Sequence, residues 1–208
     1  MTTSSELLDL SPVMPVVVLD EAEVAPDVAR ALLAGGIRTI ELTLRTPAAL
    51  AAIEKVASQV PDIVVGAGTV TTPRQAADAA DAGAAFLVTP GTTESLLDAV
   101  TATGLPFLPG AATVSEAMRL TERGLDTLKF FPAAASGGPA ALKAFAGPLP
   151  QLTFCPTGGV SVANAPDYLA LSNVGCVGGS WLTPGDAVAA RDFERIEALA
   201  KECSALAA

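Results

Sequence analysis

Short apolar runs alternate with Ala/Leu-rich segments along the whole chain, and this alternation restricts the fold more than any other feature. The apolar runs contain β-branched residues and stop at Gly, Pro or Thr, so we expect β-strands. The segments between them have helical spacing, so strands and helices alternate. The eight expected strands are residues 15–19, 39–44, 63–70, 85–90, 106–111, 127–132, 152–158 and 174–182.

Alternating βα units predict an α/β fold with parallel strands and right-handed crossovers. Eight units close most simply into a (β/α)8 barrel, or TIM barrel, of which 208 residues would make a compact example. We expect residues 1–208 to form one domain, with residues 1–14 as an N-terminal extension or short helix over the bottom of the barrel. A doubly wound open sheet is the alternative, but no G-x-G-x-x-G follows the first expected strand.

Glycines and one capping motif mark the expected helix ends. Thr113 and Glu116 form a T-x-x-E capping box at the start of one helix. Five glycines follow helical segments, where a left-handed residue commonly ends a helix. They are Gly36, Gly83, Gly104, Gly124 and Gly147.

Charge and hydropathy narrow the range of partners. The net charge of −10 argues against nucleic acid and against anionic membranes. No apolar run approaches the roughly 20 residues of a membrane-spanning helix, and residues 1–11 lack the basic and apolar regions of a secretory signal. The three cysteines, Cys155, Cys176 and Cys203, follow no C-x-x-C spacing. We therefore expect reduced thiols in the cytoplasm.

The chain contains no histidine, which excludes several kinds of chemistry. A Ser–His or Cys–His nucleophile pair and an imidazole metal site are both impossible. Any general acid or base must be a carboxylate, a lysine, a tyrosine, a cysteine or a bound water. Cysteines and aspartates also do not cluster at ligand spacing, so we expect neither a metal nor another cofactor.

Lys129 differs from the other three lysines because it lies within an apolar expected strand, in the stretch TLKFFPA. A buried ammonium group is costly unless it is paired or gives up its proton. One interpretation is a structural ion pair in the interior. The other is a lysine kept partly neutral so that its amine can attack a carbonyl group.

Alternation along two strands indicates a partner for this lysine. In TIELTLR, residues Glu41, Thr43 and Arg45 share one face, and in TLKFFPA residues Lys129 and Phe131 do. The opposite, apolar faces must meet the helices, so these polar faces point into the barrel. The two strands are the second and the sixth, which lie opposite each other in an eight-stranded ring. We expect Glu41 and Lys129 to approach each other across the axis, although a buried pair without chemistry remains the alternative.

Polar and glycine residues gather where the expected strands end. Thr69 and Pro90 each end a strand, and active sites of (β/α)8 barrels lie at the C-terminal ends of the strands. TGG follows the seventh expected strand and GGS closes the eighth. In this fold the loops at these two strand ends often bind phosphate through backbone N–H groups. The residues concerned are Thr157, Gly158, Gly159, Gly178, Gly179 and Ser180.

Six segments occur in a fixed order: IELTLRT, GAGTV, TPG, KFFPA, CPTGG and GGSWL. Together they closely resemble the family of 2-keto-3-deoxy-6-phosphogluconate (KDPG) aldolases, to which 4-hydroxy-2-oxoglutarate (KHG) aldolases also belong. The resemblance runs from about residue 13 to about residue 185. It implies a metal-free class I aldolase on a (β/α)8 barrel, usually a homotrimer. Such enzymes cleave the phosphorylated keto acid to pyruvate and glyceraldehyde 3-phosphate in the Entner–Doudoroff pathway.

The resemblance also implies roles for individual residues. Lys129 matches the lysine that forms the Schiff base, and Glu41 matches the proton-transfer carboxylate. Arg45 and Thr69 match the groups that hold the carboxylate of pyruvate. The residues that match the pocket wall and the distal, phosphate end of the site are Pro90, Phe131, Thr157, Gly158, Gly159 and Ser180.

Other functions remain open at the level of sequence. The same residues would serve an aldolase that acts on the galactonate epimer or mainly on unphosphorylated 4-hydroxy-2-oxoglutarate. A phosphosugar isomerase or epimerase is disfavoured, because those enzymes typically use histidine, a metal or paired acids. A barrel that binds phosphosugars without turnover would not need a nucleophile, whereas Lys129 is present.

Overall fold

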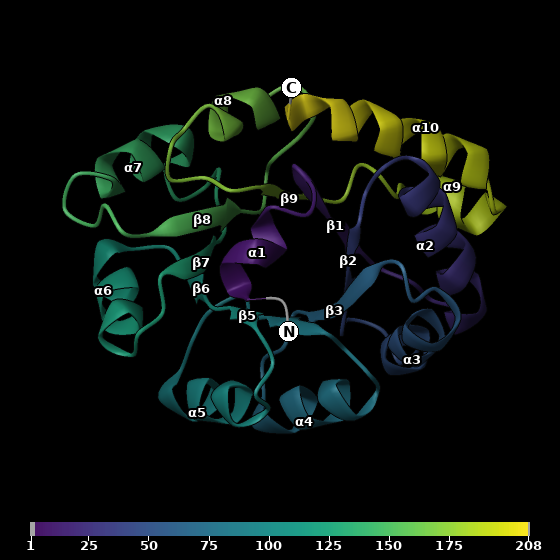
Figure 1. The fold of residues 1–208 in the computed structure, drawn as a ribbon, viewed down its shortest axis with the longest axis horizontal. Helices are drawn as coiled ribbons and strands as arrows, with labels where there is room; N and C mark the ends of the chain where they lie inside the picture. Colours follow the sequence, from purple (N-terminus) through teal and green to yellow (C-terminus); the bar gives the residue numbers. More distant parts are fainter. Residues whose placement is uncertain (1–2, 208) are drawn as a thin grey trace.

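The computed structural model describes residues 3–207 as strands that surround a common centre, with helices on the outside (Figure 1). The strands are β1 (Val13–Val17), β2 (Thr39–Thr43), β3 (Val64–Gly68), β4 (Phe86–Val88), β5 (Phe107–Leu108), β6 (Gly110–Ala111), β7 (Thr127–Phe130), β8 (Thr153–Pro156) and β9 (Val177–Gly179). The α-helices are α1 (Ser4–Leu8), α2 (Ala25–Ala34), α3 (Ala49–Gln59), α4 (Pro73–Asp81), α5 (Glu94–Ala102), α6 (Val114–Glu122), α7 (Gly138–Phe145), α8 (Ala165–Leu169), α9 (Gly185–Ala190) and α10 (Phe193–Ser204).

All the paired strands run parallel, as the βα alternation predicts, and they form two sheets. The six-stranded sheet has the order β5-β4-β3-β2-β1-β9, and the three-stranded sheet has the order β6-β7-β8. Two isolated bridges, Phe154 to Val174 and Thr157 to Gly178, connect β8 to the edge of the larger sheet. The predicted ring of eight strands is therefore borne out only in part.

Proline causes the division between the two sheets. The expected strand 106–111 is split, because Pro109 separates β5 from β6. Proline has no N–H to donate to a neighbouring strand, so the ladder cannot pass through it without interruption. β5 pairs with β4 on one side, and β6 pairs with β7 on the other.

Alternate residues of the strands face two separate apolar layers, as the period of two in a strand requires. In β4, Leu87 belongs to the large layer between strands and helices, whereas Phe86 and Val88 belong to a smaller cluster. The smaller cluster also contains Leu7 and Leu8 of α1, which covers the N-terminal side of the strands near the centre in Figure 1. The expected short N-terminal helix is present, although residues 1–2 of the predicted extension lie outside the described residues.

The helix boundaries follow the sequence signals with one exception. Thr113 and Glu116 form the predicted capping box, in which the Thr113 hydroxyl accepts from the Glu116 N–H. The residues with the expected positive φ are Gly36, Gly83, Gly104 and Gly124. The prediction for Gly147 is wrong, because α7 ends at Phe145, Ala146 after it is right-handed, and Gly147 does not adopt a positive φ. α9 was not expected from the sequence.

Thr183 lies buried in the loop between β9 and α9, and its hydroxyl has no hydrogen-bond partner among the described residues. We expect Thr183→Val to raise the free energy of unfolding by about 1 kcal/mol, because a methyl group of the same shape removes a desolvated, unpaired hydroxyl. Urea unfolding measures the change. Thr127→Val is the matched control, since the buried Thr127 hydroxyl donates to Asp126. A Thr183→Val variant no more stable than the wild type would contradict the prediction.

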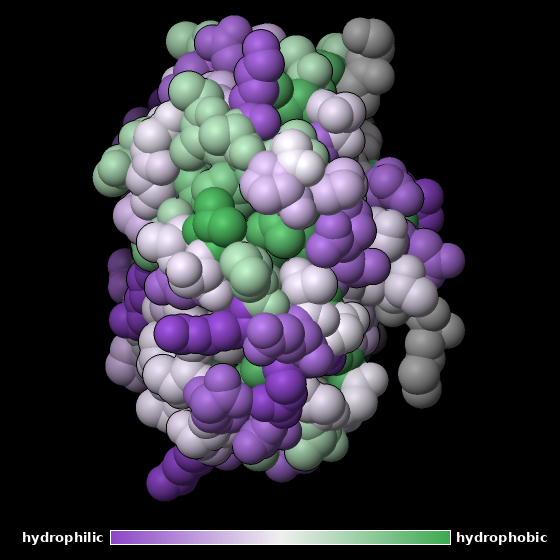
Figure 2. Space-filling model, turned by 90° about the vertical axis from the view of Figure 1, so that its left-hand side faces the viewer, coloured by the Kyte–Doolittle hydropathy of each residue, from purple (hydrophilic) through white to green (hydrophobic). Residues whose placement is uncertain are grey.

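The surface gives two further observations. Within residues 3–207, no helix is both long and apolar enough to cross a lipid bilayer. Val114 and Met118 of α6 are large hydrophobic side chains that remain exposed, Met118 by 49%. Figure 2, which views the molecule from the side where Figure 1 shows α6 and α7, shows hydrophobic residues gathered near the middle of that face.

Candidate active site

The residues singled out from the sequence lie in or just after the C-terminal halves of the parallel strands, so they share one edge of the fold. This edge is where parallel α/β folds place their sites. The solvent exposure of these residues differs across the set. Glu41 and Lys129 are buried, Phe131, Thr69 and Pro90 are half-buried, and Arg45, Gly159 and Ser180 are exposed. The set therefore ranges from exposed residues at this edge to a buried pair, Glu41 and Lys129, which forms the floor of the candidate site.

Lys129 and Glu41 meet at that floor. The Lys129 Nζ donates to the Glu41 Oε1 at 3.3 Å, across from β7 in the smaller sheet to β2 in the larger one. Lys129 is 3% exposed and Glu41 is 1% exposed. The predicted approach of these two side chains is confirmed. Burial of both charges carries a large desolvation cost that their mutual attraction only partly offsets, so packing alone is a weak explanation for the pair.

Gly68 makes room for the carboxylate, and its role was not recognised from the sequence. A Cβ at Gly68, on β3, would collide with the carboxylate of Glu41. A Cβ at Gly66, on the same face of that strand, would collide with the ring of Phe86. Alternate glycines in a strand indicate close approach of other groups to one face. The spacing of GAG in the sequence carries that signal, but not the identity of the occupant.

Phe131 and Gly158 form a wall beside the lysine. The Lys129 Nζ lies 5.4 Å from the centroid of the Phe131 ring, within the range of a cation–π contact. Gly158 has a φ of +95°, and a Cβ there would lie 3.1 Å from the Phe131 ring. Glycine at this position therefore satisfies both the backbone conformation and the close contact.

Arg45 and Thr69 form a second polar pair nearer the solvent. The Arg45 Nε donates to the Thr69 Oγ1 at 3.0 Å. The terminal nitrogens of the guanidinium bond to no other residue within 3–207, so they can bind a ligand. Thr69 has a φ of +57°, a left-handed conformation that is costly for a β-branched residue. Strain of this kind is common where surrounding structure holds a residue for binding or catalysis.

The two glycine motifs, TGG and GGS, differ in backbone conformation and in burial. Gly158 and Gly159 both have positive φ and follow β8, and their N–H groups donate to no other backbone group among the described residues. Gly178 and Gly179 are buried within β9 instead. A Cβ at Gly178 would collide with the Thr157 hydroxyl, and a Cβ at Gly179 would collide with the Trp181 ring.

Three members of the predicted set are less closely tied to the floor. Pro90 follows β4, and its backbone lies against Gly110 rather than in hydrogen-bond contact with Lys129. Gly159 packs against Ala134. Ser180 lies exposed after β9, and no hydrogen bond joins its side chain to the other described residues of the set.

Two buried thiols, Cys155 and Cys176, lie in the interior cluster. The Cys176 Sγ lies 3.6 Å from the Cys155 Sγ, and both are buried. The hydrogen bond with Cys155, together with burial, raises the pKa of the Cys176 thiol well above its ordinary value. Because the thiolate is the reactive form of cysteine, Cys176 is held in an unreactive state.

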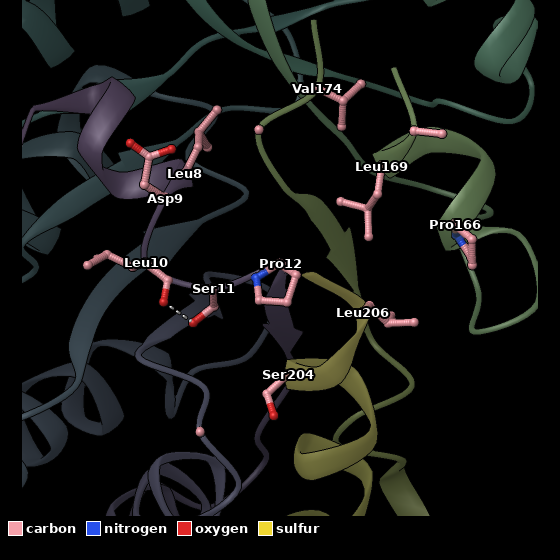
Figure 3. A pocket seen from close by; sticks show the side chains of 13 residues that line it. Leu8, Asp9, Leu10, Ser11, Pro12, Pro166, Leu169, Val174, Ser204 and Leu206 are labelled. Atoms are coloured by element: carbon pink, nitrogen blue, oxygen red, sulfur yellow. Dashed lines mark hydrogen bonds between the residues drawn. The ribbon is translucent and has the colours of Figure 1, made fainter. Parts of the chain in front are cut away.

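A cavity of about 740 Å³ lies at the opposite end of the strands and is not the candidate site. Figure 3 shows it between α1, α8 and the end of α10, with Leu10, Leu169 and Leu206 on its walls. Its polar groups include Asp9 and Ser11, and the Ser11 hydroxyl donates to the Leu10 carbonyl. No amine lines it. In addition, residues 3–207 hold no cluster of His, Cys, Asp and Glu side chains that could bind a metal ion.

The comparisons with known proteins agree with this geometry. Residues 5–199 match the model of a family described as KDPG and KHG aldolase. The chain belongs to this family. The predicted resemblance is thereby confirmed, over nearly the full length of the chain.

Similar members of the KDPG and KHG aldolase family include both sequences and solved structures. The 2-dehydro-3-deoxy-phosphogluconate aldolase of Dickeya dadantii is 52% identical over 204 residues, which are 98% of this chain and 96% of that one. A KDPG aldolase from Legionella pneumophila, solved with pyruvate captured as a covalent carbinolamine, superposes with a TM-score of 0.95, 46% identity and 98% coverage of both chains. A KDPG aldolase from Zymomonas mobilis, solved with 3-phosphoglycerate, has a TM-score of 0.93 and 44% identity, and covers 99% of this chain and 97% of that one.

Proposed function

We propose that the protein is a class I aldolase that cleaves 2-keto-3-deoxy-6-phosphogluconate to pyruvate and glyceraldehyde 3-phosphate through a Schiff base on Lys129. The observation that carries the proposal is the buried contact of 3.3 Å between the Lys129 amine and the Glu41 carboxylate. The contact joins a nucleophile to a group that can transfer protons. The names of the relatives support the substrate, and the carbinolamine of the Legionella enzyme supports covalent chemistry.

The chemistry proceeds through a series of covalent intermediates on Lys129. The uncharged Lys129 amine attacks the C2 ketone to give a carbinolamine, and loss of water gives an iminium ion. The C4 hydroxyl loses its proton, the C3–C4 bond breaks, and its electron pair moves toward the iminium to form an enamine while the aldehyde leaves. Protonation of the enamine at C3 and hydrolysis of the resulting iminium release pyruvate and regenerate the amine. Glu41 carries the protons, directly or through one water.

The remaining residues of the set hold the substrate. Arg45 and Thr69 bind the carboxylate next to the reacting ketone, because a guanidinium binds a carboxylate with two parallel hydrogen bonds. Pro90 and Phe131 form the wall beside the amine. The distal phosphate lies against the N–H groups of Gly158 and Gly159, which bond to no other described backbone group, and near Thr157 and Ser180. Successive N–H groups at positive φ make an anion site. Gly178 and Gly179 support this end from within β9.

The proposal extends to the assembly and to the setting of the reaction. The two sheets act as one (β/α)8 barrel in a single domain, with the break at Pro109 as a local interruption. The protein functions as a cytoplasmic homotrimer in the Entner–Doudoroff pathway. The exposed Val114 and Met118 of α6 support self-association, because hydrophobic side chains grouped on one face favour contact with another subunit.

Borohydride trapping tests the mechanism. We expect the wild-type protein to release pyruvate from the phosphorylated keto acid, and to lose this activity when treated with pyruvate and borohydride together. Reduction of the imine should leave one stable secondary amine, and peptide mapping should place it on Lys129. Borohydride without pyruvate is the control. A modification on Lys55, Lys143 or Lys201 instead, or no modification, would contradict the proposal.

A further inference from the structure

The strand ladder is broken beside Lys129, at Pro109. On one side of the break the Thr89 N–H donates to the Leu108 carbonyl at 3.2 Å, which is the last backbone bond from the end of β4 to β5. On the other side a side chain continues the connection, because the Gly110 N–H donates to the Thr89 hydroxyl at 3.1 Å. Thr89 is only 1% exposed, so water does not compete for this bond.

A second hydroxyl binds the same glycine. The Thr92 Oγ1 donates to the Gly110 carbonyl at 3.1 Å, and it lies 3.5 Å from the Thr89 Oγ1. The backbones also approach closely, since a Cβ at Gly110 would collide with the carbonyl of Pro90. We call the group of Thr89, Thr92 and Gly110 the threonine clasp. It joins the loop that carries Pro90 to strand β6.

The clasp is one hydrogen-bonded step from the nucleophile. Gly110 lies opposite Lys129 in the ladder between β6 and β7. The Lys129 N–H donates to the Pro109 carbonyl at 2.9 Å. Hydrogen bonds to β6 thus fix the position of the Lys129 backbone. Two threonine hydroxyls in turn fix the position of β6 relative to the larger sheet, which carries Glu41.

We propose that Thr89 and Thr92 are positioning residues, which keep Pro90 and the backbone of Lys129 in register with Glu41 across the break at Pro109. The proposal rests on the proposed aldolase function. Loss of a clasp hydroxyl shifts the amine relative to its proton-transfer partner, and small displacements of reacting groups slow chemistry strongly. Binding of the substrate carboxylate is affected less, because Arg45 follows β2 and Thr69 follows β3, away from the break at Pro109.

Three variants test the clasp. Thr89→Val keeps the shape of the side chain and removes the acceptor for the Gly110 N–H, so we expect kcat to fall about tenfold while KM changes less than about twofold. Thr89→Ser retains a hydroxyl and should restore kcat to within about twofold of the wild type. Thr92→Val, at a half-buried position, is the milder change and should lower kcat about threefold.

Thr127→Val is the matched control. Thr127 lies on the same strand as Lys129 and is also buried, but its hydroxyl donates to Asp126 at the other end of β7. We expect its kcat to equal that of the wild type. Hydrogen exchange of the Gly110 amide gives a readout independent of turnover, and it should accelerate in Thr89→Val but not in Thr89→Ser or Thr127→Val.

The outcomes separate the two proposals. Wild-type kcat in both valine variants of the clasp, or a Thr89→Ser variant as slow as Thr89→Val, would overturn the positioning role and leave the aldolase function intact. A kcat that falls equally in Thr127→Val would also overturn it, because the effect would then be general. A wild-type protein that does not cleave the keto acid would overturn the proposed function and the positioning role with it.

Discussion

Replacement of Lys129 by methionine is expected to lower the rate of aldol cleavage by at least about 10⁴-fold, because no other group at the site can form an iminium ion. Methionine is close to the lysine side chain in length, but it carries a thioether sulfur and no amine. The substrate should still bind, since Arg45 and Thr69 are unchanged. Pyruvate with borohydride should leave no covalent adduct on the variant. Measurable cleavage by Lys129→Met with the wild-type kcat would show that another group is the nucleophile.

The same substitution should also destabilise the fold, and this effect must be separated from the loss of chemistry. Glu41 is 1% exposed and would lose its buried partner. Removal of one member of a buried ion pair costs about 3–5 kcal/mol, whereas replacement of both by apolar residues is often neutral. The double variant Lys129→Met with Glu41→Met should therefore recover much of the unfolding free energy, measured in urea, and remain inactive. Recovery of activity together with stability would contradict the assignment.

The sequence predicts the central pair of the site because strand alternation is a local property. Glu41 shares a face with Thr43, while Ile40 and Leu42 belong to the layer under the helices. Lys129 is likewise flanked by Leu128 and Phe130, which both lie in that layer. Once the strands are known to surround one centre, period-two patterning is sufficient to direct both charged side chains inward.

Other features depend on contacts between segments far apart in the sequence, and these were missed. The collision that an added Cβ at Gly68 would make involves Glu41, on another strand, so the strand that contains Gly68 does not identify its partner. The partnership of Thr89 and Thr92 with Gly110 was not predicted, because nothing near them in sequence identifies Gly110 as their partner. Pro109 was assigned to the interior of one strand, although its missing N–H divides that strand in two.

The glycine doublets show how one motif can serve two purposes. Both were predicted to bind phosphate, on the basis of their position at the ends of the last two strands. Gly158 has a positive φ and lies at the loop, where its N–H is available, but Gly178 is buried in β9 beneath the Thr157 hydroxyl. Composition and position in the chain cannot distinguish a glycine needed for its backbone conformation from one needed for its small size.

Glu41→Gln is expected to lower kcat for cleavage by about 10²- to 10⁴-fold, because the amide cannot accept and return a proton. Gln has nearly the shape of Glu, so it fits the space beside Gly68 and offers its amide oxygen to the Lys129 amine. Formation of the iminium with pyruvate should continue slowly. Borohydride should therefore still trap the adduct on Lys129, while exchange of the pyruvate methyl protons with deuterium, which requires the enamine, should be lost when followed by NMR.

The separation of trapping from exchange is what distinguishes a proton shuttle from a structural partner. If Glu41 only balanced the charge of the lysine, Glu41→Gln would lower trapping and exchange to the same extent, because both depend on the amine. If Glu41 transfers protons, exchange falls far more than trapping. Glu54→Gln, at an exposed position on α3, is the matched control and should leave both rates unchanged. Exchange at the wild-type rate in Glu41→Gln would remove the carboxylate from the mechanism, even though it lies within hydrogen-bond distance of the amine.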